Sequence, residues 1–249
     1  MIAMNVIDAL ALPPEARVDQ RVPKKLLVEN GAPTAADKRQ INEGIEELLW
    51  LAALKPSTIG VPEYRDGIRE YLEIAVLLLS LRPGAKAGRL VELIHRAVPY
   101  PVVLLTNQSE TVTLSLAHKR WSQGEAGKTV LDDAVSLCER FQHPAAPSFL
   151  GSLSLAGQPR AHLMALYQGW IDCLHAFRAA CITGQFTIPT NAEAASTRRD
   201  ALVEYERLTR QIATLGAKAE QELQLNRRVA LNLEIKRLEA ELANVRAHL

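Results

Sequence analysis

The chain of 249 residues carries 29 Lys and Arg against 28 Asp and Glu, which leaves a formal net charge of +1 at pH 7. This balance excludes a generally basic nucleic-acid coat protein and an acidic tail protein. Hydrophobic residues make up 48% of the chain and charged residues 23%, a composition typical of a globular protein with a buried core. The length predicts one or two domains.

The cysteine count and the hydropathy pattern predict the compartment. The chain has three cysteines and no C-x-x-C pair: Cys138, Cys173 and Cys181. An odd number leaves one cysteine without a disulfide partner, which is not typical of a secreted disulfide framework. The first residues show no charged start followed by an apolar core, so we expect no signal peptide. The longest apolar stretch, residues 74–79, is far shorter than the roughly 18 to 20 residues that cross a bilayer. We therefore expect a soluble cytoplasmic protein without membrane attachment.

Prolines interrupt residues 1–33, where we expect an irregular N-terminal arm with one short helix after Pro14. A longer helix is predicted from Thr34 to about Leu54. Thr34 is a favourable N-cap residue, and the helix should end before Pro56. Apolar residues recur at helical spacing along it: Ile41, Ile45, Leu48 and Ala52.

The next segments predict a small sheet. Residues 70–81 read as a strand buried on both faces, residues 86–98 as a helix, and residues 102–105 as a second apolar strand. This order favours a parallel pair with a right-handed crossover. A turn at residues 107–110 leads into residues 111–117, where apolar and polar side chains alternate as in a half-buried strand.

The predicted fold class is α/β (α+β): a small mixed β-sheet domain with flanking helices over residues 34–140. Residues 129–137 fit either a fourth strand or the start of a helix. Residues 141–160 form a connector almost without charge, which packs in part through Phe149. An amphipathic helix follows over residues 161–185, with a regularly spaced apolar seam: Leu163, Tyr167, Trp170, Leu174, Phe177 and Cys181.

Residues 192–249 predict a helical extension with long coiled-coil-like helices. Two heptad runs, Ala201 to Ala219 and Leu231 to Leu249, differ in phase, and consecutive steps of four join them as in a stutter. Ten basic and nine acidic residues surround these runs, which is a coiled-coil composition. The extension is expected to be one long helix or two helices broken at Gly216.

No metal, cofactor or catalytic site is predicted. His162 and His175 share a helix but point to different sides, and no nucleotide-binding or hydrolase motif is present. A restriction-nuclease-like cluster could be assembled from acidic residues and one lysine: Asp132, Asp133, Glu73, Glu110 and Lys119. The element order does not fit that core, so we favour a turn for the two aspartates and an exposed strand end for the lysine.

Four basic pairs could contact phosphates, since such contacts need only positive charge. The candidates for nucleic acid are Lys24, Lys25, Lys119 and Arg120, and further pairs are Arg198-Arg199 and Arg227-Arg228. Each pair has acidic neighbours, which favours solvated faces. Asn226 and Asn232 flank Arg227-Arg228, and polar residues beside an apolar seam fix register or partner choice, so this element is a predicted recognition point.

Several segments together resemble an uncharacterised bacterial family, domain of unknown function 4391. The segments are Arg21-Val-Pro-Lys-Lys25, Trp50-Leu-Ala-Ala-Leu-Lys-Pro-Ser-Thr-Ile59, Ala97-Val-Pro-Tyr-Pro-Val-Val-Leu-Leu105, Ser115-Leu-Ala-His-Lys-Arg120 and Gln224-Leu-Asn-Arg-Arg-Val-Ala-Leu-Asn232. The resemblance implies a gene neighbourhood of DNA methyltransferases and helicases in restriction or phage-defence clusters. It implies no catalytic residues.

We expect a non-enzymatic accessory or assembly subunit of such a defence system, which binds a protein partner or a second copy through its C-terminal helices. The expected contact residues are Leu208, Ile212, Leu215, Ile235, Leu238 and Leu242, together with Asn226, Arg227, Arg228 and Asn232. The alternatives are a DNA-contacting subunit of a methyltransferase–helicase complex and a divergent metal-dependent nuclease.

Overall fold

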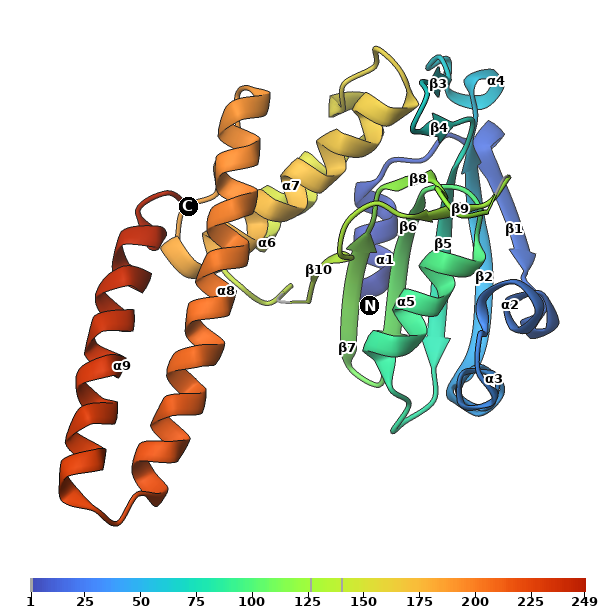
Figure 1. Cartoon of the computed structure of the whole chain (residues 1–249). Coiled ribbons are helices and arrows are strands. Elements are labelled where there is room, and N and C mark those ends of the chain that lie inside the picture. The colour runs from blue at the N-terminus through green and yellow to red at the C-terminus, as the bar shows by residue number, and fades with distance from the viewer. Residues whose placement is uncertain (1, 126, 140) are drawn as a thin grey trace. The chain divides into compact units, whose positions relative to one another are not determined.

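A computed structural model describes residues 2–125, 127–139 and 141–249. The chain divides into two compact units, Met1–Leu174 and His175–Leu249, and each is described by itself. The helix α7 (Leu163–Thr183) runs across this boundary. The predicted fold class is confirmed, since a mixed sheet with flanking helices precedes long C-terminal helices (Figure 1).

The first unit is built on a six-stranded sheet in the order β1-β2-β5-β6-β7-β10. The parallel pair β5–β6 is joined by the helix α5 (Ala87–Ala97), which confirms the predicted parallel pair, and the other neighbouring strands pair antiparallel. The strands are β1 (Arg17–Arg21), β2 (Ile45–Leu54), β5 (Ile74–Leu81), β6 (Val102–Gln108), β7 (Thr111–Leu116) and β10 (Ser136–Cys138). Two small ribbons pair β3 (Tyr64–Arg65) with β4 (Glu70–Tyr71), and β8 (Lys119–Trp121) with β9 (Thr129–Leu131).

Helices cover the sheet. One buried cluster joins α2 (Lys24–Gly31), α3 (Ala35–Gly44) and α5 to β2, β5 and β6, and it includes Leu27, Ile41 and Leu90. Figure 1 shows these three helices on the same face of the sheet. The remaining helical elements of this unit are α1 (Ile2–Ala9), η1 (Pro14–Ala16), α4 (Pro56–Ile59), α6 (Ala146–Ser152) and η2 (Leu155–Gly157).

The predicted helix from Thr34 to Leu54 is wrong beyond Gly44. Thr34 does cap a helix, because its side chain accepts a hydrogen bond from the backbone N–H of Asp37 at 3.1 Å. The chain then continues as β2, which pairs with β1 on one side and β5 on the other. Leucine and alanine favour a helix locally, but pairing on both edges satisfies the backbone of β2 and overrides that preference.

The N-terminal arm is also more regular than expected. It contains α1, the edge strand β1 and α2, and its prolines mark element boundaries: Pro14 opens η1 and Pro23 precedes α2. β1 is mostly exposed and polar, so its apolar pattern gives little sign of a strand. The open alternative for residues 129–137 resolves to the short strands β9 and β10.

The predicted connector packs through α6 and η2. Phe149 and Leu153 are fully buried, and the Trp170 indole N–H donates to the backbone oxygen of Leu153 at 2.8 Å. The predicted seam of α7 is buried throughout the first unit at Leu163, Tyr167, Trp170 and Leu174. This part of the helix prediction is confirmed.

α2 lies close to α5 at Gly31. A Cβ atom there would lie 2.5 Å from the Cβ of Ala97 and 3.0 Å from the carbonyl oxygen of Leu93. We expect Gly31→Ala to lower the free energy of unfolding by about 1–3 kcal/mol through overpacking, measured by urea denaturation. Gly88→Ala on α5 is the matched control, because its Cβ would enter open space, and it should not destabilise the protein. Equal losses for the two variants would contradict the steric explanation.

In the second unit, α8 (Ala192–Gln221) and α9 (Leu225–Arg246) form a helical hairpin (Figure 1). Asn191 caps α8 by accepting a hydrogen bond from the N–H of Ala194 at 2.8 Å. The helices are separated at residues 222–224, so both expected alternatives are wrong: the extension is not one long helix, and Gly216 lies inside α8. A mid-helix glycine costs only about 1 kcal/mol, whereas folding back allows the two apolar seams to cover each other.

Candidate protein-interaction surface

The helix α9 carries apolar residues on two opposite sides. Toward α8 it presents Leu231, Ile235, Leu238, Leu242 and Val245, which are buried or half-buried. On the other side, Leu225, Val229 and Leu233 are 63%, 49% and 64% exposed. Lys236, Ala240 and Ala243 continue this line of exposed residues. We call these six positions, Leu225 to Ala243, the outer face of α9.

Helical geometry explains why the six positions share one face. Their successive steps are four, four, three, four and three residues. At 100° per residue these steps place them within an arc of about 80°, opposite the side that packs on α8. A helix that is apolar on two opposite sides is normally buried between two neighbours. α8 covers one side of α9 only.

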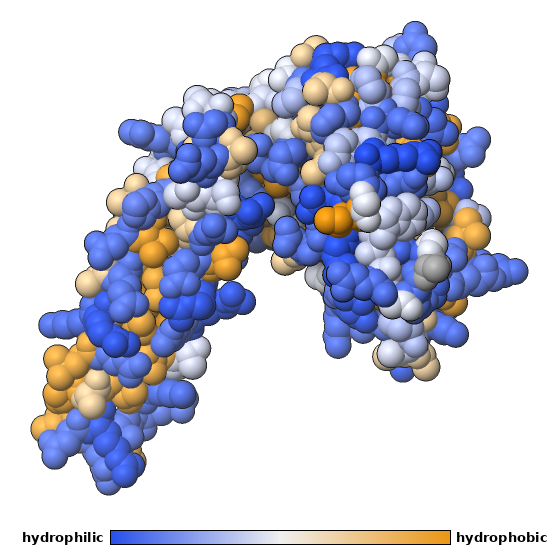
Figure 2. All heavy atoms as spheres, turned by 45° about the horizontal axis from the view of Figure 1, so that its top comes forward, coloured by the Kyte–Doolittle hydropathy of each residue, from blue (hydrophilic) through white to orange (hydrophobic). Residues whose placement is uncertain are grey.

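The exposed apolar residues gather toward the tip of the hairpin. Leu223, in the connection between the helices, is 97% exposed and lies next to the start of the outer face. Figure 2 shows hydrophobic side chains along the hairpin and near this tip. Full burial of a leucine or valine side chain contributes about 1.5–3 kcal/mol, so a surface that covered this face would gain several kcal/mol. Exposed apolar patches of this kind mark interaction sites.

The six apolar contact residues predicted from the heptads lie inside the hairpin. Leu208 and Leu238 are 0% and 2% exposed, and the other four are half-buried along the same seam: Ile212, Leu215, Ile235 and Leu242. These residues are covered by the chain itself, because the connection at residues 222–224 brings α9 back along α8. They hold the hairpin together and are not open to a partner.

The predicted recognition point lies beside the outer face. Asn226, Arg227, Arg228 and Asn232 are all exposed on the first turns of α9. Three apolar residues lie between and beside them, at positions outside the predicted heptads: Leu225, Val229 and Leu233. Their signal in the sequence is the regular four-residue spacing of Leu225, Val229 and Leu233, which continues after the stutter.

The candidate nucleic-acid residues mostly serve the fold. Lys24 donates from Nζ to the carbonyl oxygens of Asn42, at 3.1 Å, and of Ile45 at the end of α3. Burial, together with the nearby Arg82 and Arg21, lowers the pKa of Lys24. Lys25 is exposed and pairs with Glu29 on its own helix.

The pair Lys119-Arg120 is likewise directed inward. Lys119 is 2% exposed and donates to the carbonyl oxygens of His95, at 2.5 Å, and of Val98, so it caps the C-terminal end of α5. The Arg120 guanidinium lies 3.2 Å from Asp132. A lysine enclosed in this way has no free ammonium for a phosphate, so Lys119 is not retained as a phosphate contact.

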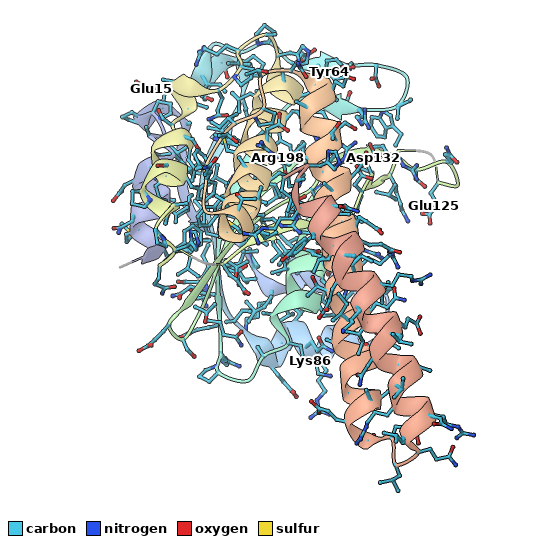
Figure 3. All side chains as sticks on the ribbon, turned by 90° about the vertical axis from the view of Figure 1, so that its left-hand side faces the viewer. Glu15, Tyr64, Lys86, Glu125, Asp132 and Arg198 are labelled. Atoms are coloured by element: carbon cyan, nitrogen blue, oxygen red, sulfur yellow. The ribbon has the colours of Figure 1, made fainter. Side chains whose placement is uncertain are left out.

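The nuclease-like cluster is not assembled. Asp132, labelled in Figure 3, pairs with both Arg69 and Arg120. Glu73 is buried against Lys55 at 3.1 Å, and Glu110 lies in the turn between β6 and β7. Across the residues that the structure describes, no three His, Cys, Asp or Glu side chains come together as metal ligands.

A buried polar chain joins β4 to α7 within the first unit. The hydroxyl of Tyr71 lies 2.5 Å from Nδ1 of His118, and Nε2 of His118 lies 2.8 Å from Oε1 of Gln168. Burial lowers the pKa of His118 and raises the pKa of Tyr71. Both ring nitrogens of His118 are engaged, so this chain of hydrogen bonds ties β4 and α7 together.

Comparison of the sequence with known proteins identifies its family but finds no similar solved structure. Within the described part of the chain, none of the helices is long and apolar enough to span a membrane. No curated protein and no solved structure matches the chain. The family model described as Domain of unknown function (DUF4391) matches residues 10–242. This match includes the whole sheet and the hairpin except its last residues, and the chain therefore belongs to the DUF4391 family.

Proposed function

We propose that the protein is a non-enzymatic assembly subunit that binds another protein molecule through the outer face of α9. The observation that carries the proposal is the exposure of Leu225, Val229 and Leu233 on one side of a helix whose other side is already packed on α8. Exposing such an apolar stripe to water is unfavourable, and a protein surface that covered it would remove this unfavourable free energy of hydration.

The biological setting is part of the same proposal. The family resemblance implies genes beside DNA methyltransferases and helicases, so we place the protein as an accessory subunit of a restriction or phage-defence system in the cytoplasm. Among the described residues no metal-ligand cluster is assembled, which supports a binding role over metal-dependent chemistry.

A DNA-contacting role is the second candidate, and Arg227 and Arg228 are the residues that favour it. Both are exposed at the start of α9, whose first turn contains no acidic residue. Binding of any duplex through several phosphates should weaken steeply as salt is raised. Binding without such a salt dependence, or no binding at all, would exclude this role.

The test of the association proposal is the double variant Val229→Asp/Leu233→Asp in the full chain. Both side chains are exposed, so the variant should fold as the wild type does, which circular dichroism would check. We expect each complex or oligomer that the wild type forms, measured by light scattering and by co-purification from the host, to weaken at least about 30-fold.

The matched control is Val203→Asp, which places the same charge at an apolar residue of α8 that is 62% exposed. This variant should retain every association. If the double variant on α9 also kept all associations, the outer face would not be the binding surface and the proposal would fail.

A further inference from the structure

We propose that the occupant of the outer face of α9 is the same face of a second copy of this chain, packed antiparallel about a two-fold axis. This inference rests on the proposed function and names the partner. Two such hairpins would place both α9 helices at the centre of a four-helix arrangement, with the α8 helices outside.

The two helices of the hairpin differ in the way this arrangement requires. α9 is apolar on two opposite sides, as a central helix must be. The exposed side of α8 is mainly polar, and Val203 is the only large hydrophobic residue of α8 with more than a third of its surface exposed in the described chain. An outer helix needs only one apolar side. The distribution of apolar residues therefore assigns α9 to the interior and α8 to the outside.

The large apolar residues of the outer face lie in its first half and the alanines in its second half, so the face complements itself in the antiparallel direction. In a two-fold antiparallel pair, residues whose numbers add up to about 468 lie opposite each other when the axis passes near residue 234. Leu225 then faces Ala243 of the second copy, and Val229 faces Ala240 of the second copy. Leu233 faces the aliphatic stem of Lys236 of the second copy, whose ammonium can reach water. Each large side chain meets a small or flexible one.

The charges beside the outer face fit the same register. Arg228 and Glu239 lie on the same flank of α9, and same-flank residues face each other in an antiparallel pair. Their numbers also add up to about 468, so Arg228 would meet Glu239 of the second copy twice per dimer. Within the described residues, neither side chain has an ion-pair partner on its own chain. On the other flank, Arg237 would face Ala230 of the second copy.

A parallel pair would lack this complementarity. Each residue of the outer face would then lie opposite itself, which brings the two Lys236 ammonium groups together in the middle of the apolar stripe. Ala240 and Ala243 would also face their own copies, which leaves that end of the stripe poorly filled compared with the leucine end. The antiparallel register offsets the two Lys236 residues by about 6 Å along the axis, and it places large side chains opposite small ones at both ends of the stripe.

The first test is a charge exchange, read by the dimer dissociation constant of the purified full chain in sedimentation equilibrium. We expect the wild type to form a dimer that dissociates on dilution. Arg228→Glu and Glu239→Arg should each weaken it about 10-fold or more, because each creates two like-charged pairs per dimer. The double variant Arg228→Glu/Glu239→Arg should restore the wild-type constant. A double variant as weak as either single variant would overturn the proposed register.

The second test is chemical cross-linking in a Cys181→Ala background, which leaves the buried Cys138 and Cys173. The double variant Leu225→Cys/Ala243→Cys should give a covalent dimer with a short bismaleimide linker, since the two positions face each other across the interface. Leu225→Cys alone should not, because the two copies of residue 225 would lie about 27 Å apart along the axis. A covalent dimer from Leu225→Cys alone would show a parallel pair and overturn the inference.

The outcomes separate this inference from the function it rests on. A concentration-independent monomer whose association with another protein is lost in Val229→Asp/Leu233→Asp would overturn the second copy as occupant and leave the proposed function standing. A dimer that survives this double variant would overturn both, since a different surface would then hold it together.

Discussion

Between pH 6.5 and 4.5, the variant His95→Leu is expected to lose about 2 kcal/mol less stability than the wild type loses. His95 lies on α5 and is fully buried, and its Nε2 is 3.0 Å from the hydroxyl oxygen of Ser115. Burial, with a smaller contribution from Lys119, lowers the pKa of His95 from 6.5 to about 3. The unfolded chain therefore binds a proton over this pH range that the folded chain does not bind.

The sign follows from this difference in protonation. A group whose pKa is lower in the folded state, and whose charged form is the protonated one, makes the protein less stable as the pH falls below the unfolded pKa. The slope approaches about 1.4 kcal/mol per pH unit between pH 6.5 and 3. The three tryptophans, Trp50, Trp121 and Trp170, all lie in the first unit, so urea denaturation followed by tryptophan fluorescence reports the unit that contains His95.

Ser115→Ala is the matched control for His95→Leu. It removes the hydroxyl next to Nε2, with a loss of about 1 kcal/mol at pH 7, and it retains the titrating imidazole. Its stability should therefore fall with acid as steeply as that of the wild type. An unchanged acid slope in His95→Leu would show that His95 is not the buried titrating group.

The second large effect is expected above neutral pH, where Lys119 should make the folded protein more stable as the pH rises. Lys119 is 2% exposed, and burial lowers its pKa from 10.5 to about 7, although the carbonyl oxygens at the end of α5 favour its charged form. Between pH 7 and 9 the unfolded chain binds a proton that the folded chain has released. Stability should therefore rise by about 2–3 kcal/mol over this range.

Lys119→Met should lack this rise, which urea denaturation at pH 7 and 9 would measure. Lys119→Arg is the control with a permanent charge, because a guanidinium does not lose its proton in this range. It too should lack the rise, and it should be the least stable of the three proteins at pH 9. A wild-type slope in Lys119→Met would assign the titration to another group.

Local sequence patterns are sufficient for part of the first unit. The apolar runs at residues 74–81 and 102–105 and the amphipathic segment between them identify the β5–α5–β6 crossover, because a strand buried on both faces needs no information beyond its own composition. The alternating pattern of β7 holds over its first four residues, with Val112 and Leu114 buried and Thr111 exposed, whereas Ser115 is fully buried against His95. These elements carry their signal within about ten residues.

β2 and the basic residues show where local patterns fail. The residues of β2 are rich in leucine and alanine and fit a helix by spacing, and only pairing with two distant strands makes them a strand. From its place just after a strand, Lys119 is expected to be exposed. Its ammonium group instead donates to carbonyl oxygens at the end of α5, 21 and 24 positions earlier in the chain. Neither environment can be read from neighbouring residues.

The C-terminal part divides in the same way. The heptad spacing predicts helices with an apolar seam in residues 192–249, because such spacing is a local property of the chain. The turn at residues 222–224 is a feature of the folded structure, and it covers one apolar side of α9 and leaves Leu225, Val229 and Leu233 exposed. Periodicity states which residues share a face, whereas burial depends on which other segment packs against that face, and that is settled by contacts between residues far apart in the sequence.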